Sequence, residues 1–142
     1  MKNTIRFFFL ATLLASCVST TGVVQGKLCF PSENVPAMNV YLKTVGADKV
    51  YKLVSKDNQQ AFTFKKIPEG NYVAFAYTVE TTSLDLNNKK SKASGGFTHF
   101  VPCGLSVDCK DHTLISFKVN KGKTTGAISI CDWYGAIVPA EK

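Results

Sequence analysis

Arginine is almost missing from this sequence. Its 17 basic residues include one arginine, Arg6, so every base from residue 7 onward is a lysine, and the formal net charge is +7. The planar guanidinium fork is the group that best recognises phosphates and guanine edges. Without it, the basic balance indicates a solvated, lysine-rich surface, and we expect no nucleic-acid partner.

Motifs for catalysis and calcium binding are also lacking. The sequence has no G-x-S-x-G nucleophile motif and no EF-hand spacing, and it holds only ten acidic residues. Asp108, Asp111 and Asp132 are interpreted as turn residues, because aspartate side chains bond to nearby backbone groups. We therefore expect no enzymatic activity, no catalytic residues and no cofactor.

The N-terminus has the layout of a secretory signal. Lys2 and Arg6 precede an apolar run from Phe7 to Ala15, which is the order of charged and apolar regions in an export signal. The run has about nine residues, whereas a membrane-spanning helix needs roughly twenty. The run therefore predicts export rather than a lasting transmembrane segment.

The four residues where this run ends, LASC at positions 14–17, resemble the lipobox of bacterial lipoproteins. The resemblance implies cleavage before Cys17 and acylation of that cysteine with a diacylglycerol and an amide-linked chain such as palmitate. Two or more acyl chains make a stable anchor, at about 0.8 kcal/mol per buried methylene. Val18 and Ser19 resemble the outer-membrane sorting class. The alternative is an ordinary secretory signal, with Cys17 incidental.

These features divide the chain into a signal peptide (1–16), a lipidated tether (17–23), one domain (24–138) and a C-terminal tail (139–142). The processed chain would have 142 − 16 = 126 residues and a net charge of +5, because Lys2 and Arg6 are lost. A chain of this length makes one domain. We expect an exported protein, anchored in the bacterial envelope at the outer membrane.

Four cysteines remain once Cys17 is set aside, namely Cys29, Cys103, Cys109 and Cys131. An even number suits two disulfides in an oxidising compartment, and four cysteines allow three pairings. We favour Cys103 with Cys109, closing a short loop, and Cys29 with Cys131, joining the first strand to the last. The sequence alone leaves the pairing open.

A metal site is the alternative role for part of this set. His99, Cys103, Cys109 and His112 are spaced H-x3-C-x5-C-x2-H, and zinc accepts two thiolates and two imidazoles. The spacing lacks the C-x2-C or H-x3-H arm of common zinc sites, and exported thiols tend to form disulfides. We therefore favour a disulfide-closed loop without metal.

Apolar residues recur with period two in short runs between turn residues, and no segment has sustained helical periodicity. This is the strand signature. Pro68-Glu69-Gly70 predicts a tight hairpin between AFTFKKI and NYVAFAY. The pattern predicts an all-β fold, a single antiparallel β-sandwich of about seven to eight strands stapled by disulfides. Strands are expected near residues 24–30, 39–45, 49–54, 61–66, 72–81, 97–101, 113–120 and 125–132.

Three segments carry a family resemblance: GKLCF at 26–30, PAMNVYL at 36–42, and FTF at 62–64 followed by IPEGNYV at 67–73. Together they resemble transthyretin-like (prealbumin-like) sandwich modules, including the carboxypeptidase regulatory-like and collagen-adhesin B-type repeats. The match covers about half of the processed chain, and the last third has no counterpart in the generic module. The resemblance implies binding or architecture, with no catalytic residues to carry over.

Two surface features are candidate binding sites. Trp133 and Tyr134 follow the last strand, where they either cover the end of the core or form an exposed stacking platform for a sugar or peptide. Lys89, Lys90 and Lys92 cluster in a polar loop, which is either a plain hairpin connection or a basic contact for anionic lipid or polysaccharide.

From these observations we expect a non-enzymatic envelope lipoprotein that binds a protein or glycan partner or serves as a spacer. A metal-binding protein using the His/Cys cluster is the first alternative. A small enzyme acting on wall polymer is the second, and it needs a concave pocket where a carboxylate or histidine meets a tyrosine or tryptophan.

Overall fold

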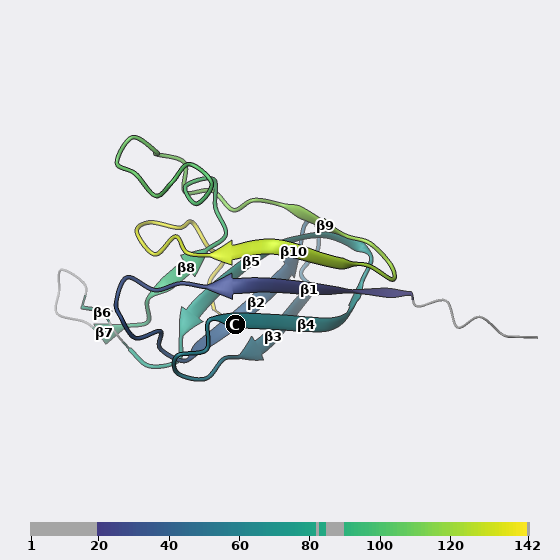
Figure 1. Ribbon diagram of the computed structural model, residues 1–142, viewed down its shortest axis with the longest axis horizontal. Helices are drawn as coiled ribbons and strands as arrows, with labels where there is room; N and C mark the ends of the chain where they lie inside the picture. Colours follow the sequence, from purple (N-terminus) through teal and green to yellow (C-terminus); the bar gives the residue numbers. More distant parts are fainter. Residues whose placement is uncertain (1–19, 82, 85–89, 142) are drawn as a thin grey trace, which may run out of the picture.

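The computed structural model describes residues 20–81, 83–84 and 90–141 (Figure 1). Within these ranges the regular structure is entirely β, which confirms the predicted fold class. The described residues include no helix that is long and apolar enough to cross a membrane. Cys17, the predicted signal peptide and the first part of the predicted tether lie outside the described residues.

The described residues form ten strands of two to nine residues each. They are β1 (Thr21–Leu28), β2 (Met38–Thr44), β3 (Val50–Val54), β4 (Ala61–Pro68), β5 (Gly70–Thr78), β6 (Ser83–Leu84), β7 (Lys90–Ser91), β8 (Ser94–Gly96), β9 (Phe117–Val119) and β10 (Thr124–Ile130). β1 begins at Thr21, so the last residues assigned to the tether belong to the first strand.

Two main sheets face each other. One has the strand order β10-β1-β4, and the other has the order β3-β2-β5-β8, with β9 also paired to β5. β6 and β7 form a separate two-stranded ribbon. Among the described strands, the pairs are antiparallel except for β1 and β10, which run parallel. The chain therefore departs from a purely antiparallel sandwich at this one pair.

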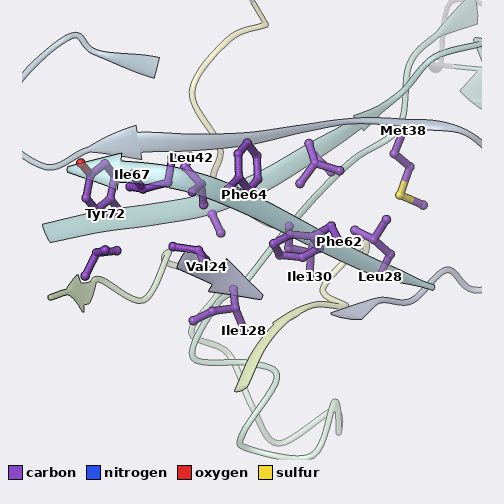
Figure 2. Close-up of a cluster of buried hydrophobic side chains, with 14 of the residues drawn as sticks. Val24, Leu28, Met38, Leu42, Phe62, Phe64, Ile67, Tyr72, Ile128 and Ile130 are labelled. Atoms are coloured by element: carbon purple, nitrogen blue, oxygen red, sulfur yellow. The ribbon is translucent and has the colours of Figure 1, made fainter. Parts of the chain in front are cut away.

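The core lies between the two sheets, as Figure 2 shows for residues from both. Period-two alternation places Phe62 and Phe64 of β4 inside, and Ile128 and Ile130 of β10 beside them. Leu42 of β2 comes from the opposite sheet and is fully buried. Each fully buried aliphatic or aromatic side chain contributes about 1.5–3 kcal/mol, so this interface stabilises the fold.

The predicted tight hairpin at Pro68-Glu69-Gly70 is wrong, because β4 and β5 belong to different sheets. The turn carries the chain across the sandwich, and the hydroxyl of Tyr72 donates to the carbonyl of Pro68 at 2.9 Å. Both segments have an apolar face. Because the chain crosses between the sheets, the apolar face of β4 and the apolar face of β5 point toward each other and are both buried. In a hairpin the two strands would instead lie side by side in one sheet.

The strands predicted at 97–101 and 113–120 are also corrected. Residues 94–96 form β8 instead, Thr98 makes only an isolated bridge with Leu114, and β9 is limited to Phe117–Val119. The physical reason is a competing partner: Gly96 exchanges backbone hydrogen bonds with Asp132 at 3.0 and 3.2 Å. That contact ends the ladder, and a turn begins at His99.

The sandwich has two ends that differ in composition. We call the end where β1 begins, at Thr21, the proximal end, and the end where β1 stops, at Leu28, the distal end. The turn between β9 and β10 lies at the proximal end, while the long segment of residues 97–116 projects at the distal end (Figure 1).

The C-terminal segment lies on the outer face of the larger sheet. The hydroxyl of Tyr77 donates to the carbonyl of Pro139 at 2.9 Å, and Lys92 Nζ forms an ion pair with Glu141 at 2.7 Å. From the sequence, we predict that residues 139–142 form a tail outside the domain. The described part of that tail is instead fixed to β5 and to the segment before β8.

Candidate binding site

Two disulfides tie the distal end together. Cys29 and Cys131 follow β1 and β10 directly, and their Cα atoms are 4.7 Å apart although they are separated by 102 positions. Cys103 and Cys109 close a short loop, with Cα atoms 6.0 Å apart. Both favoured pairings are confirmed. Disulfides form and persist in oxidising compartments, so these bonds indicate an extracytoplasmic environment.

The proposed His/Cys metal cluster is not assembled. Cys103 and Cys109 are bonded to each other, so neither sulfur is a free thiolate for zinc. His99 is exposed, whereas His112 turns its Nδ1 toward Asp132 at 2.8 Å. Among the described residues no group of three or more His, Cys, Asp or Glu side chains has a metal-binding arrangement. The metal alternative would require a reduced loop.

A pocket of about 610 Å³ opens at the distal end, between the disulfide-closed loop and the segment that follows β10. Its volume lies in the range of small-ligand sites, roughly 300–1,000 Å³. We call it the loop pocket. It is lined by Phe100, Leu105, Ser106, Val107, Cys109, Lys110, His112 and Tyr134.

A buried carboxylate positions two residues of the loop pocket. Asp132 is fully buried, and its Oδ2 accepts the Thr98 hydroxyl at 2.7 Å and lies 2.8 Å from Nδ1 of His112. Its Oδ1 accepts the backbone N–H of Tyr134 at 3.1 Å. A carboxylate only accepts hydrogen bonds, so Nδ1 of His112 is the donor, and Nε2 is the acceptor nitrogen of the neutral ring.

Aromatic rings form one wall of the loop pocket. The Phe100 ring lies 4.4 Å from the His112 imidazole between centroids, with planes tilted by 31°, and 6.2 Å from the Tyr134 ring in an edge-on arrangement. Phe100 is buried, whereas Tyr134 is 63% exposed. The wall therefore has a fixed base and an open aromatic face, which suits stacking on a ligand.

Exposed large apolar side chains gather around this pocket. Val107 at the loop tip is 94% exposed, and Leu105 and Ile137 are exposed as well. Ile137 belongs beside the pocket, because its backbone N–H donates to the carbonyl of His112 at 3.2 Å. Apolar side chains that cluster on a surface, rather than scatter over it, mark a binding surface.

Trp133 and Tyr134, which the sequence treats as one aromatic pair, have separate roles. Trp133 is half-buried, packs against the core, and meets the Phe30 ring edge-on at 5.1 Å. It also lies over Gly95, where a Cβ atom would come within 2.5 Å of the indole. Trp133 therefore covers the end of the core, and Tyr134 alone offers an exposed ring.

The lysine loop is not one basic surface in the described chain. Lys89 lies outside the described residues, Lys90 is exposed, and Lys92 is engaged by Glu141. The turn interpretation of Asp111 is confirmed, because its Oδ1 accepts both the backbone N–H and the hydroxyl of Thr113. These hydrogen bonds hold the pKa of Asp111 below its ordinary value.

Sequence reasoning missed Asp132 and Phe100 as parts of the site. A signal was present in the sequence, because Asp132 follows Ile128 and Ile130 at the next alternate position of the last strand. Continuing that alternation one step past the end of the strand points the carboxylate inward. A buried carboxylate requires partners, since burying an unpaired charge is costly. The two histidines of the sequence were the natural candidates for that partner.

Comparison with the models of known protein families, with curated proteins and with solved structures returns no match. The likeness to transthyretin-like modules and to the lipoprotein lipobox stays a prediction from sequence motifs.

Proposed function

We propose that this chain is a non-enzymatic lipoprotein of the bacterial envelope, anchored through Cys17, whose β-sandwich binds a protein partner at the loop pocket. The observation that carries the proposal is the cluster of exposed apolar side chains around that pocket, with Val107 at its tip. Interfaces between proteins centre on such apolar and aromatic anchors.

The pocket is held ready for a partner by covalent and polar contacts. The disulfide between Cys103 and Cys109 closes the loop that carries Val107. The buried carboxylate of Asp132 holds the His112 ring and the backbone N–H of Tyr134 by hydrogen bonds. Rigid anchors lose little conformational entropy on binding, which favours affinity. This preorganisation supports a binding role for the loop.

The position of the pocket supports the same role. β1 has eight residues, and a strand rises about 3.3 Å per residue, so β1 separates the distal end from the point where the chain enters the fold by about 26 Å. With the lipid attached at Cys17, the short N-terminal tether would meet the proximal end. The distal pocket would then face away from the lipid and toward other envelope components.

A photoreactive amino acid placed at position 107 of the full chain tests the proposal in the envelope. We expect a specific cross-linked protein that disappears when Tyr134 is replaced by alanine, because the exposed ring is part of the same surface. The matched control is a photoreactive group at Val54, a valine that is also exposed but lies on β3 away from the pocket. Equal capture from both positions would contradict the proposal.

Affinity for the captured partner gives a second measurement. Val107→Ser and Tyr134→Ala should each weaken binding at least tenfold, since central anchors contribute about 2 kcal/mol or more, while Val54→Ser should leave it unchanged. Sedimentation with purified wall glycan distinguishes the glycan alternative. If the chain binds glycan in a way that depends on Tyr134, and no protein is cross-linked at position 107, the ligand of the loop pocket is a sugar and not a protein.

Enzymatic action on wall polymer is the second candidate, and the contact between His112 and Asp132 within a pocket is the observation that favours it. A carboxylate on Nδ1 leaves Nε2 as an acceptor, which is the arrangement of a general base. The test is the release of soluble fragments from purified wall polymer. Release that His112→Gln abolishes would support this candidate, whereas no release by the intact chain would reject it.

Mass spectrometry of the N-terminus tests the anchor separately. We expect the chain to begin at Cys17 with acyl chains attached. A chain that begins elsewhere and carries no acyl group would overturn the lipoprotein assignment but leave the pocket and its partner to the cross-linking experiment.

A further inference from the structure

The proximal end gathers several segments around the start of β1. Thr21 pairs with Pro68 of β4. The turn before β10 closes on the same point, because the N–H of Gly122 donates to the carbonyl of Thr21 and the N–H of Val23 donates to the carbonyl of Lys123, both at 3.0 Å. The incoming chain is therefore surrounded by the end of β4 and the turn between β9 and β10.

These surrounding segments are strongly basic. In residues 65–72 and 117–125 the only acid is Glu69, while the bases, which we call the proximal lysines, are Lys65, Lys66, Lys118, Lys121 and Lys123. All of these lysines are exposed. The ion pairs found in the described part of the chain involve Lys43, Lys92 and His112, so the charge of the proximal lysines is not neutralised by the fold.

The distal end carries most of the exposed acids. Exposed acids lie on its loops: Glu33, Asp57, Glu80, Asp108 and Asp111. Each of these loops follows or precedes a strand terminus at the distal end. Among the described residues, these five acids outnumber the exposed lysines of the same loops, which are Lys56, Lys90 and Lys110. At the proximal end the further acid Asp48 is paired with Lys43. The sandwich therefore has a charge gradient along its length, from a basic proximal end to a more acidic distal end.

We propose that the proximal lysines dock on the anionic headgroups of the membrane that holds Cys17, and thereby hold the sandwich upright with the loop pocket directed outward. This proposal rests on the lipid anchor of the proposed function. Lysines near an anionic lipid surface each strengthen partition about fivefold, and the attraction falls off within a Debye length. An acyl anchor beside Thr21 would keep the lysines within that distance, while the distal acids would be repelled.

Chemical acetylation of lysines in the full, lipidated chain tests the docking. The chain is reconstituted in vesicles of phosphatidylcholine with phosphatidylglycerol and, separately, in pure phosphatidylcholine. We expect the proximal lysines to react several-fold more slowly in the anionic vesicles, with the difference removed by high salt. Lys90 and Lys110, exposed at the distal end, serve as internal references and should react equally in both.

Two matched triple variants separate docking from general charge. Replacing Lys66, Lys121 and Lys123 with glutamine should abolish the protection of Lys65 and Lys118 in anionic vesicles. The control replaces three exposed lysines of the distal end with glutamine, namely Lys56, Lys90 and Lys110. It makes the same change in net charge and should leave the protection of Lys65 and Lys118 intact. Equal effects of the two triples, or equal reaction rates in both vesicles, would overturn the proposal.

A failure of the membrane docking can be distinguished from a failure of the proposed function. Capture of a partner at position 107 does not require anionic lipid, so a chain that binds its partner but shows no lysine protection overturns the docking alone. If Cys17 proves unacylated, the same measurement on the unacylated chain with added anionic vesicles must still show salt-sensitive protection, and its absence would reject the docking as well.

Discussion

Tyr41 and Glu141 are joined by a hydrogen bond of 2.9 Å from the phenol hydroxyl to Oε1, although they lie 100 positions apart in the sequence. The same carboxylate accepts the side-chain N–H of Asn39 at 2.6 Å and pairs with Lys92. Tyr41 and Asn39 alternate along β2 with the core residue Val40, so they belong to the outer face. The C-terminal segment therefore covers polar and aromatic groups that would otherwise face water.

This contact predicts a stability profile with losses at both extremes of pH. Burial and the neighbouring Glu141 raise the pKa of Tyr41 to about 12. Burial alone would raise the pKa of Glu141, but hydrogen bonds from Lys92, Tyr41 and Asn39 outweigh it and hold that pKa below its ordinary value of 4.5. The phenol's contribution should be complete below pH 10 and lost as the pH rises through about 12. The carboxylate's contribution should be complete above its ordinary pKa and lost as the pH falls through the lowered value.

Thermal unfolding measured across pH checks both losses. Glu141→Gln should cost about 1–2 kcal/mol near neutral pH, because it replaces a charged acceptor in a partly exposed site, and it should flatten the acid limb of the profile. Glu69→Gln, which removes an exposed acid, is the control and should leave the profile unchanged. The contact would lose its assigned role if the two variants behaved alike.

The sequence was sufficient for the fold class and for the expectation of two disulfides, whose favoured pairing only the structure decides. It was not sufficient for the contacts that build the pocket and place the tail. Period-two patterning located most strands because each has one buried face. The turn at Pro68-Glu69-Gly70 was mispredicted because a turn's residues do not say which sheet the next strand joins. The docking of Glu141 depends on Tyr41, 100 positions away, and no local pattern reports such a contact.

The two disulfides should differ in their contribution to stability. In the loop-entropy view, the cross-link between Cys29 and Cys131, with a separation of 102, contributes about 5 kcal/mol, whereas the cross-link between Cys103 and Cys109, with a separation of 6, contributes about 2 kcal/mol. Urea unfolding of the two double-alanine variants measures the difference. We expect the short-loop variant to remain folded but to lose partner binding, because Val107 is no longer held. A larger stability loss from the short loop would contradict this ranking.

Asp132 should be the most sensitive polar residue of the distal end. Asp132→Ala removes the acceptor for Thr98 and His112 in a fully buried position, so it should cost about 3 kcal/mol. Asp132→Asn keeps the shape and one acceptor oxygen and should cost less, while changing the NMR resonances of the His112 ring. Asp108→Ala, an exposed acid of the neighbouring loop, should be close to neutral. Equal losses at both positions would show that the buried acceptor is unimportant.

The close approach of Gly95 and Trp133 gives a prediction that needs no ligand. A Cβ atom at Gly95 would lie 2.5 Å from Cδ2 of the indole, so Gly95→Ala must displace the ring from the end of the core, at a cost of about 1–3 kcal/mol for overpacking. Trp133 is the single tryptophan of the chain, and its fluorescence therefore reports this displacement alone, as a shift toward the emission of an exposed indole.

Gly126→Ala is the matched control for this substitution. Gly126 is an exposed glycine of β10 with no atom within 4 Å of its ideal Cβ position, so the added methyl group meets nothing and the emission spectrum should not change. Because Trp133 stands between Asp132 and Tyr134 in the chain, displacement of its ring in Gly95→Ala should also disturb the loop pocket and weaken partner binding. Unchanged fluorescence and stability in Gly95→Ala would mean that the indole does not cover the core at this point.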